Sequence, residues 1–180
     1  MTAAKEFDQF VKQMKKENET SSPVDWNKRK DDWLNALTRL YSTVEGYLSK
    51  YTPDRSIRID YEDVNIIEER LGSYSARKMM LTLGKSIVEL APVGTVIFGA
   101  YGRVNIQGAS ARLRLVLVEP TVDQVRLGIR VLQPREQLTR SEPVDFGNLV
   151  WKVASDPPNV RLYDLTKENL FEAIMNVAAT

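Results

Sequence analysis

Apolar and polar residues alternate through the middle of the chain. Between positions 78 and 132 the apolar residues recur mostly at every second position, in runs separated by turns that contain Gly or Pro. Successive side chains of a strand point to opposite faces, so this spacing predicts a sheet with one apolar face that other elements must cover. The apolar residues of these runs are Leu81, Leu83, Ile87, Val88, Leu90, Val96, Ile97, Phe98, Leu113, Leu115, Leu117, Val125, Leu127, Ile129 and Val131.

Turn-forming residues separate the runs. Gly84-Lys85 fits a tight hairpin, because glycine readily adopts the positive φ that such a turn needs. Residues 92–95, 107–110 and 120–123 combine Pro or Gly with small or polar residues and predict further turns. Strands joined by short hairpins run antiparallel, so we expect a mainly antiparallel sheet.

A wide apolar stripe predicts a long helix over residues 24–51. Ser22-Pro23-Val24-Asp25 is a start signal, since serine caps helices, proline suits the first turn and an acid there favours the positive helix end. Lys30 interrupts the narrow seam of a coiled coil, so we expect the helix to lie across the sheet, with a coiled-coil dimer as the alternative. The stripe comprises Trp26, Trp33, Leu34, Leu37, Leu40, Tyr41, Val44, Tyr47, Leu48 and Tyr51.

Shorter helices are predicted at the two ends of the chain. Residues 1–21 combine an amphipathic helix with a charged, hydroxyl-rich linker, and residues 22–180 are expected to form one domain around a single core. Thr166 is placed to cap a C-terminal helix. The apolar face of the first helix comprises Phe7, Phe10, Val11 and Met14, and that of the last comprises Leu170, Phe171, Ile174 and Val177.

The remaining segments predict shorter elements. Residues 56–61 alternate as an edge-type strand, and residues 63–72 fit either a strand or a helix, which we interpret as an extended segment with a helical turn before Gly72. Residues 133–148 have few apolar anchors and predict a mobile, protease-sensitive loop. Residues 149–154 and 160–163 predict two late strands. Helices, then strands, then a helix indicate an α+β fold: N-terminal helices and a C-terminal helix packed on a curved, mainly antiparallel sheet.

Composition removes several classes of chemistry. Lysine plus arginine total 25 against 24 acids, so the net charge of +1 gives no overall attraction to nucleic acid or to anionic membranes. The chain has no cysteine and no histidine, which excludes disulfides, thiolate nucleophiles, Cys-built metal sites and a histidine base. We expect no cofactor. Since no signal peptide or membrane-spanning run is apparent, we expect a cytoplasmic location.

Arginines form the clearest candidate surface. Between positions 103 and 140 there are seven arginines against three acids. The arginines alternate with apolar residues on successive predicted strands, so they should project from one solvent-facing side of the sheet. Guanidinium groups bind carboxylates and phosphates. The candidate binding residues are Arg103, Arg112, Arg114, Arg126 and Arg130, together with Tyr101.

Tyr101 enters through an unusual strand sequence. Gly99-Ala100-Tyr101-Gly102-Arg103 places two glycines and an aromatic residue inside a predicted strand, as happens where a strand bends or where another group approaches its backbone. No helix or Lys-Ser/Thr pair follows as in a phosphate-binding loop, and the order differs from that of RNA-recognition strands. A bend in the sheet is the simpler interpretation.

An acidic stretch balances the arginines. Between positions 54 and 69 there are six acids against two arginines, so the two patches are expected either to meet within the fold or to meet across a dimer. The carboxylates of Asp60, Glu62, Asp63, Glu68 and Glu69 also raise the alternative of a divalent cation site, although their spacing matches no motif.

These observations identify no catalytic residue. We interpret the chain as a non-enzymatic interaction or accessory module that binds another protein or self-associates. The first alternative is binding of a nucleic-acid backbone through the arginines, and the second is a metal-dependent phosphodiesterase built on the acidic stretch.

Overall fold

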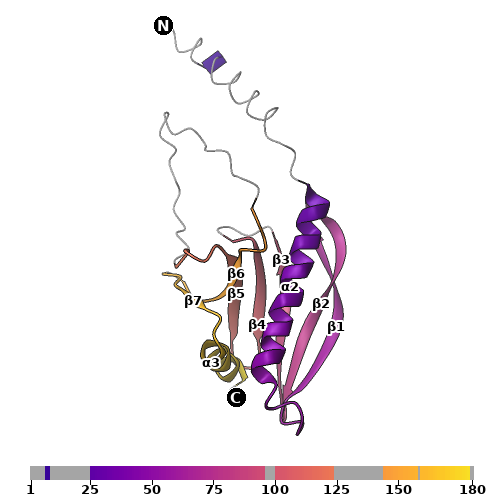
Figure 1. Cartoon of the computed structure of the whole chain (residues 1–180), viewed down its shortest axis with the longest axis vertical. Helices are drawn as coiled ribbons and strands as arrows, with labels where there is room; N and C mark the ends of the chain where they lie inside the picture. Colours follow the sequence, from indigo (N-terminus) through magenta and orange to yellow (C-terminus); the bar gives the residue numbers. More distant parts are fainter. Residues whose placement is uncertain (1–6, 9–24, 96–99, 124–143, 158, 179–180) are drawn as a thin grey trace.

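A single antiparallel sheet with two helices forms the body of the protein (Figure 1). The computed structural model describes residues 7–8, 25–95, 100–123, 144–157 and 159–178. Among these residues, the sheet has seven strands, with one helix before it and one after it in the chain. The predicted α+β fold and the antiparallel sheet are confirmed. The sheet is not strongly curled, so the predicted curvature is not supported.

The strands lie side by side in the order in which they occur in the chain, and every neighbouring pair is antiparallel. The first and last strands therefore form the two edges, and the edge strand predicted at 56–61 belongs to one of them. The strands are β1 (Arg58–Glu68), β2 (Gly72–Leu83), β3 (Ser86–Gly94), β4 (Gly102–Gln107), β5 (Arg112–Val118), β6 (Val150–Ala154) and β7 (Leu162–Asp164).

Glycines permit two of the hairpins. Gly84 has a φ of 60° between β2 and β3, and Gly72 has a φ of 71° where β2 begins. The helical turn predicted before Gly72 is wrong, because residues 63–68 continue β1 and residues 69–71 form the turn into β2. Pairing with β2 along the whole length of β1 supplies the backbone hydrogen bonds that an isolated helical turn would have supplied.

Two other predicted turns have different outcomes. The turn at 107–110 is confirmed, since β4 ends at Gln107 and β5 begins at Arg112. The predicted turn at 92–95 begins too early, because β3 continues to Gly94 with a register shift between Pro92 and Gly94. A shift of this kind lets proline stay in a strand without breaking the pairing around it. The predicted strand at 125–131 and most of the predicted loop at 133–148 lie outside the described residues.

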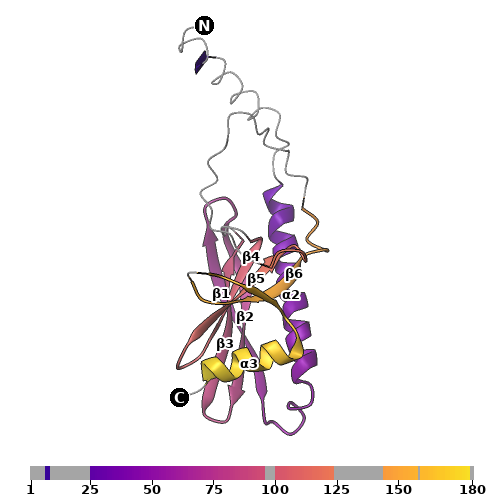
Figure 2. The same ribbon diagram turned by 90° about the vertical axis from the view of Figure 1, so that its left-hand side faces the viewer.

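The long helix α2 (Trp26–Leu48) lies across one face of the sheet (Figures 1 and 2). Its N-cap is Asp25, whose Oδ1 accepts a hydrogen bond from the Lys28 backbone N–H at 3.0 Å, so the start predicted from Ser22 lies too early. The helix also ends three residues before the predicted position. Its buried residues are Trp33, Ala36, Leu37, Leu40, Tyr41, Val44 and Leu48, which confirms most of the predicted stripe.

The C-terminal helix α3 (Lys167–Ala178) packs beside α2 on the same core. Thr166 Oγ1 accepts a hydrogen bond from the Asn169 backbone N–H at 3.2 Å, which confirms the predicted cap. Of the two residues described near the N-terminus, Phe7 and Asp8 are both helical, and the rest of the predicted first helix lies outside the described residues. The buried residues of α3 are Leu170, Ala173, Ile174 and Val177.

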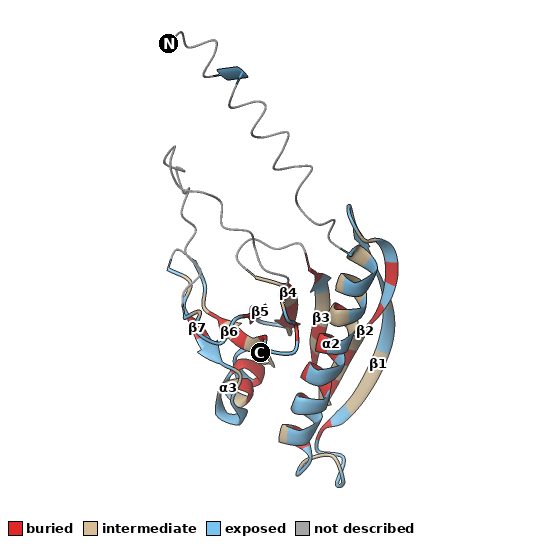
Figure 3. Cartoon of the chain, turned by 45° about the horizontal axis from the view of Figure 1, so that its top comes forward, coloured by how far each residue is buried: buried red, intermediate tan, exposed pale blue. Residues whose placement is uncertain are grey.

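One apolar core fills the space between the helices and the sheet, where the buried positions concentrate (Figure 3). We call this side of the sheet the covered face and the opposite side the far face. Val104 and Ile106 of β4 are fully buried in the same cluster as residues of α2 and α3, so they define the covered face. Alternation then places Arg103 and Asn105 on the far face. None of the described helices is long and apolar enough to cross a membrane.

Candidate interaction surface

Three of the predicted arginines share the far face of β4 and β5. Arg112 and Arg114 are two residues apart on β5, and their partners on β4 are Gln107 and Asn105. Arg103 pairs with Val116, which is the next far-face position along β5. The strand register therefore brings Arg103, Arg112 and Arg114 together, as the alternation predicts. Arg126 and Arg130 lie outside the described residues.

Arg112 lies at the end of a polar row that crosses five strands of the far face. Lys78 Nζ is 3.0 Å from Glu62 Oε2 and 3.0 Å from Glu89 Oε1. Gln107 Nε2 donates a hydrogen bond to Glu89 Oε2 at 2.8 Å, and Gln107 pairs in register with Arg112. We call these five residues the polar row. An ion pair or a hydrogen bond joins each member to the next from Glu62 to Gln107. The last member, Arg112, is exposed.

The pKa values within the polar row shift as its contacts require. Hydrogen bonds to Glu62 and Glu89 raise the pKa of Lys78 above its usual range. Hydrogen bonds from Gln107 and then Lys78 lower the pKa of Glu89. Each shift favours the charged form, so the row keeps its ion pairs at neutral pH.

The three arginines differ in their contacts. Arg114 Nη2 donates to the backbone oxygen of Ser155 at 3.1 Å and is 3.4 Å from Asp156 Oδ1. By contrast, the Nε of Arg103 is buried without a hydrogen-bond partner, as is Oδ1 of the neighbouring Asn105. Within the described part of the chain, Arg103 and Arg112 make no ion pair. The far face thus keeps two arginines that no carboxylate of these residues neutralises.

Tyr101 lies apart from the arginines, on the covered side near the start of α2. Its hydroxyl is 3.2 Å from Glu119 Oε1, and its ring meets the edge of the Phe146 ring with centroids 6.1 Å apart. The Arg29 guanidinium of α2 lies 5.6 Å from the Tyr101 centroid, and burial lowers the pKa of Arg29. Tyr101 therefore joins the residues directly before β4 to α2 and does not extend the arginine surface.

The neighbouring Gly102 explains the glycine-containing strand. A Cβ added to Gly102 would lie 2.2 Å from Trp33 Cζ3, so only glycine lets α2 approach β4 this closely. The indole of Trp33 also lies 5.9 Å from that of Trp151. Sequence reasoning identified the close approach as one option but did not identify the helix as the approaching group.

The acidic stretch does not reach the arginines. It forms most of β1, and strands β2 and β3 separate it from β4. Arg58 Nε binds Asp60 Oδ2 at 2.7 Å, and Glu62 joins the polar row. In the described structure, the acidic stretch therefore does not neutralise Arg103 or Arg112 of the same chain.

The acids of this stretch are also split by location. Asp63 lines a groove beside α2, whereas Glu68 accepts hydrogen bonds from the Tyr74 hydroxyl at 2.5 Å and from the Thr95 backbone N–H at 2.9 Å. Among the described residues, no group of three or more potential Asp, Glu, His or Cys ligands is placed to hold a metal ion. The described part of the acidic stretch therefore gives no support to a cation site.

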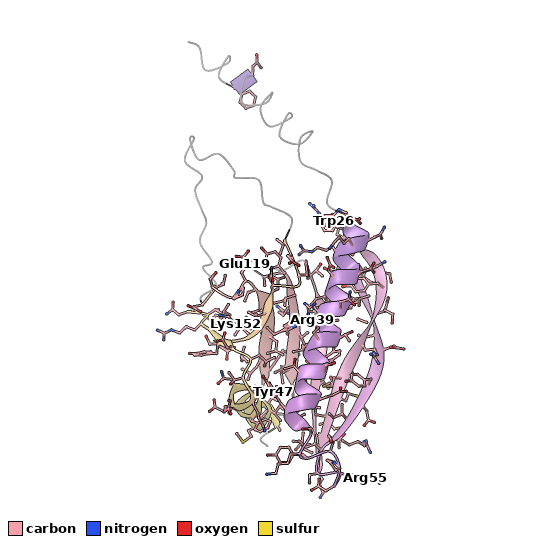
Figure 4. The ribbon with its side chains drawn as sticks, in the orientation of Figure 1. Trp26, Arg39, Tyr47, Arg55, Glu119 and Lys152 are labelled. Atoms are coloured by element: carbon pink, nitrogen blue, oxygen red, sulfur yellow. The ribbon has the colours of Figure 1, made fainter. Side chains whose placement is uncertain are left out.

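Sequence reasoning missed a buried ammonium group on the far face. The Lys152 side chain on β6 is 3% exposed, and its Nζ is 3.2 Å from both Asp123 Oδ1 and Asp164 Oδ1 and 2.9 Å from the Pro120 backbone oxygen (Figure 4). Burial acts to lower the pKa of Lys152, but its hydrogen bonds to the two aspartates outweigh burial and raise it. Three acceptors satisfy all three donors, so this lysine ties loops to the sheet and is not available to a ligand.

Comparison of the sequence with protein-family models and with curated proteins, and comparison with solved structures, found no match. Arguments about function therefore rest on the surface itself.

Proposed function

We propose that the chain is a non-enzymatic protein-interaction module whose far face binds an acidic partner protein. The supporting observation is the unmatched charge of Arg103 and Arg112 beside a polar row in which every other charge has a partner. Arg114, which pairs with Asn105, lies between them in register, so this stretch of the far face carries three guanidinium groups. A partner that presents carboxylates at this position would satisfy both arginines.

Binding of a nucleic-acid backbone is the weaker candidate. The basic groups Lys78, Lys152 and Arg114 of the far face already contact acids, which leaves few arginines for phosphates. Proteins that hold a duplex through its backbone typically use about 6–10 phosphate contacts. The mixed charge of this face suits a protein partner better.

The test compares charge reversal at two exposed basic positions. Immobilised wild-type protein, Arg112→Glu and Lys85→Glu are incubated with nuclease-treated extract, and a protein retained by the wild type is purified and titrated by calorimetry. Lys85 is the matched control, since it is exposed in the β2–β3 turn, away from β4 and β5. We expect Arg112→Glu to weaken binding by roughly tenfold or more, because like charges facing each other across an interface cost several kcal/mol.

Equal affinities for Arg112→Glu, Lys85→Glu and the wild type would contradict the proposal. Loss of binding after nuclease treatment, with retention of the protein on heparin, would favour the nucleic-acid alternative instead. If the retained protein is a second copy of the chain, its β1 acids are the expected carboxylates, and Glu62→Gln should weaken self-association.

A further inference from the structure

The two edges of the sheet differ in how their backbones are protected. At one edge, β7 is only three residues long, and the Leu162 backbone N–H donates a hydrogen bond to the Asp123 backbone oxygen at 2.9 Å. At the other edge, β1 is 11 residues long and lies outermost beside β2 (Figure 1). Within the described structure, a loop therefore covers part of the short edge, whereas the long edge stays open.

The backbone of β1 is bound on one side. β1 pairs with β2 residue by residue, from Arg58 opposite Thr82 to Glu68 opposite Gly72, without a shift in register. The described turns, loops and caps make no backbone hydrogen bond to residues 58–68. The outer edge of β1 thus presents a row of backbone N–H and C=O groups without a partner among the described residues.

The composition of β1 allows some partners and disfavours others. Proline, lysine, bulges and short length are the usual devices that prevent another strand from adding to an edge, and β1 has none of them. Its charged residues are four acids and one arginine. Pairing with a second β1 would bring acidic strands together, which like-charge repulsion disfavours, whereas a strand with basic residues would be attracted.

An exposed apolar side chain lies near the hairpin tip of this edge. Alternation places Asp63, Asn65 and Ile67 on one side of β1, and all three are exposed. Ile67 is 77% exposed, because its neighbour in register on β2 is Ser73. The Ser73 hydroxyl donates a hydrogen bond to Asn65 Oδ1 at 2.8 Å. Ile67 therefore lacks an apolar neighbour in register, and an apolar side chain on an added strand would cover it.

Asp63 supplies an acid on the same side. The three other acids of β1 are held in ion pairs or hydrogen bonds. Asp63 makes neither within the described residues, and the guanidinium of its neighbour in register, Arg77, lies 4.9 Å from the Tyr61 ring centroid. The open edge thus presents an acidic group and an apolar group four residues apart on one side.

We propose that the outer edge of β1 binds an extended segment of a partner protein as an added antiparallel strand. In such strand addition, backbone hydrogen bonds give affinity and alternate side chains give specificity. An apolar residue of the segment faces Ile67, and a basic residue four positions later faces Asp63. Strands β2 and β3 separate this edge from the arginines of β4 and β5, so the proposal stands or fails independently of the proposed function.

The test uses hydrogen exchange, followed by NMR, in the ¹⁵N-labelled full chain. The probe is a synthetic peptide, Thr-Ile-Thr-Thr-Thr-Lys-Thr-Thr-Thr, whose threonines favour extended structure. In the free protein, β2 should protect only alternate amides of β1, and saturating peptide should slow exchange at the intervening amides. A control peptide of the same composition, with Ile and Lys interchanged, should bind several-fold more weakly.

Backbone methylation separates strand addition from contact through side chains alone. N-methyl groups at one alternate set of peptide residues should abolish binding, because those N–H groups point to β1, whereas N-methyl groups at the other set should leave binding in place. Equal effects of the two sets would overturn the proposal, as would tighter binding of the interchanged peptide.

Charge reversal tests the position of the added strand. Asp63→Lys should weaken binding of the first peptide several-fold, and replacing the peptide's Lys with Glu should restore it. Glu172→Lys, at an exposed position of α3, is the matched control and should do neither. Absence of added protection in β1 would overturn the proposal. A dimer of the peptide-free protein that Ile67→Lys dissociates would also overturn it, in favour of a second copy at this edge.

Discussion

The covered face and the far face of the sheet differ in what satisfies their side chains. On the covered face, the side chains of β4 and β5 are apolar and are buried against α2 and α3. On the far face, β4 and β5 carry polar side chains except for Val116 and Val118, and two of their three arginines, Arg103 and Arg112, make no ion pair among the described residues. Stability therefore depends chiefly on one face, whereas the unmatched charges that suit binding lie on the other.

The far face is not polar along its whole width. At its β5–β7 end a smaller apolar cluster packs under loops that contribute Val122 and Val160. Lys152 contacts Pro120 and Asp123 in the loop that contains Val122, and Asp164 at the end of β7. Among the described residues of the far face, the buried polar atoms without a hydrogen-bond partner are Arg103 Nε and Asn105 Oδ1, and the exposed Arg112 lies on the neighbouring strand, so we assign the binding site to this part of the face.

The largest expected effect comes from removing an apolar side chain on the covered face. Leu37 of α2 is 3% exposed, and Leu37→Ala should lower the free energy of unfolding by about 2–5 kcal/mol through lost burial and a cavity. Ile87 on the far face is 55% exposed, so Ile87→Ala should change the free energy of unfolding by at most about 0.5 kcal/mol. Urea denaturation measures both, and equal effects would break the comparison.

A smaller loss of stability is expected at Glu68, where the tip of the β1–β2 hairpin contacts the end of β3. Glu68 accepts hydrogen bonds from the Tyr74 hydroxyl and from the backbone and side chain of Thr95. Burial and then the bond to Glu68 raise the pKa of Tyr74. Glu68→Ala should lower the free energy of unfolding by about 1–3 kcal/mol, since it leaves part-buried donors unpaired. A change below that of the exposed variant Glu69→Ala would contradict this role.

The polar row should contribute a modest, pH-dependent stabilisation. Because hydrogen bonds lower the pKa of folded Glu89 below its ordinary value of 4.5, the unfolded chain binds the proton more readily. The contribution is present above the unfolded pKa and is lost as pH falls through the lower folded pKa. Denaturation from pH 6 to pH 3 should therefore show a shallower loss of stability in Glu89→Gln than in the wild type, and parallel curves would exclude this contribution.

The smallest effect on stability is expected at Arg112. Since Arg112 is exposed and makes no ion pair among the described residues, Arg112→Ala should shift the free energy of unfolding by no more than about 0.5 kcal/mol. Arg114→Ala should cost more, because it leaves the Ser155 backbone oxygen without its donor. Thermal unfolding of the two variants distinguishes them, and a larger loss for Arg112→Ala would show that Arg112 has a structural role.

Local periodicity predicted much of the fold. Alternation identified apolar positions of β2, β3 and β5, and it placed Arg112 and Arg114 on one side, with Arg103 near by, because strand side chains alternate strictly. The helix stripe predicted the burial of Trp33 and Leu37. These features depend on positions close together in the chain, so a single sequence contains the information needed to predict them.

Features set by contacts between distant segments were not predicted. The apolar spacing at 63–72 fitted both a helix and a strand, and pairing with β2 is what makes residues 63–68 a strand. The polar row depends on the register of five strands, which no local pattern specifies. The groove beside α2 likewise depends on how a helix meets Ser75 and Ala76, some forty residues further along the chain.

Site-specific photo-crosslinking tests most directly whether the far face is the binding face. A benzophenone side chain is placed at Ile87, which is 55% exposed on the far face, or at Met175 of α3, which is 63% exposed on the helix side. Each folded variant is irradiated in nuclease-treated extract. The account predicts one specific protein adduct from position 87, suppressed by excess wild-type protein, and none from position 175. An adduct from position 175 alone would contradict it.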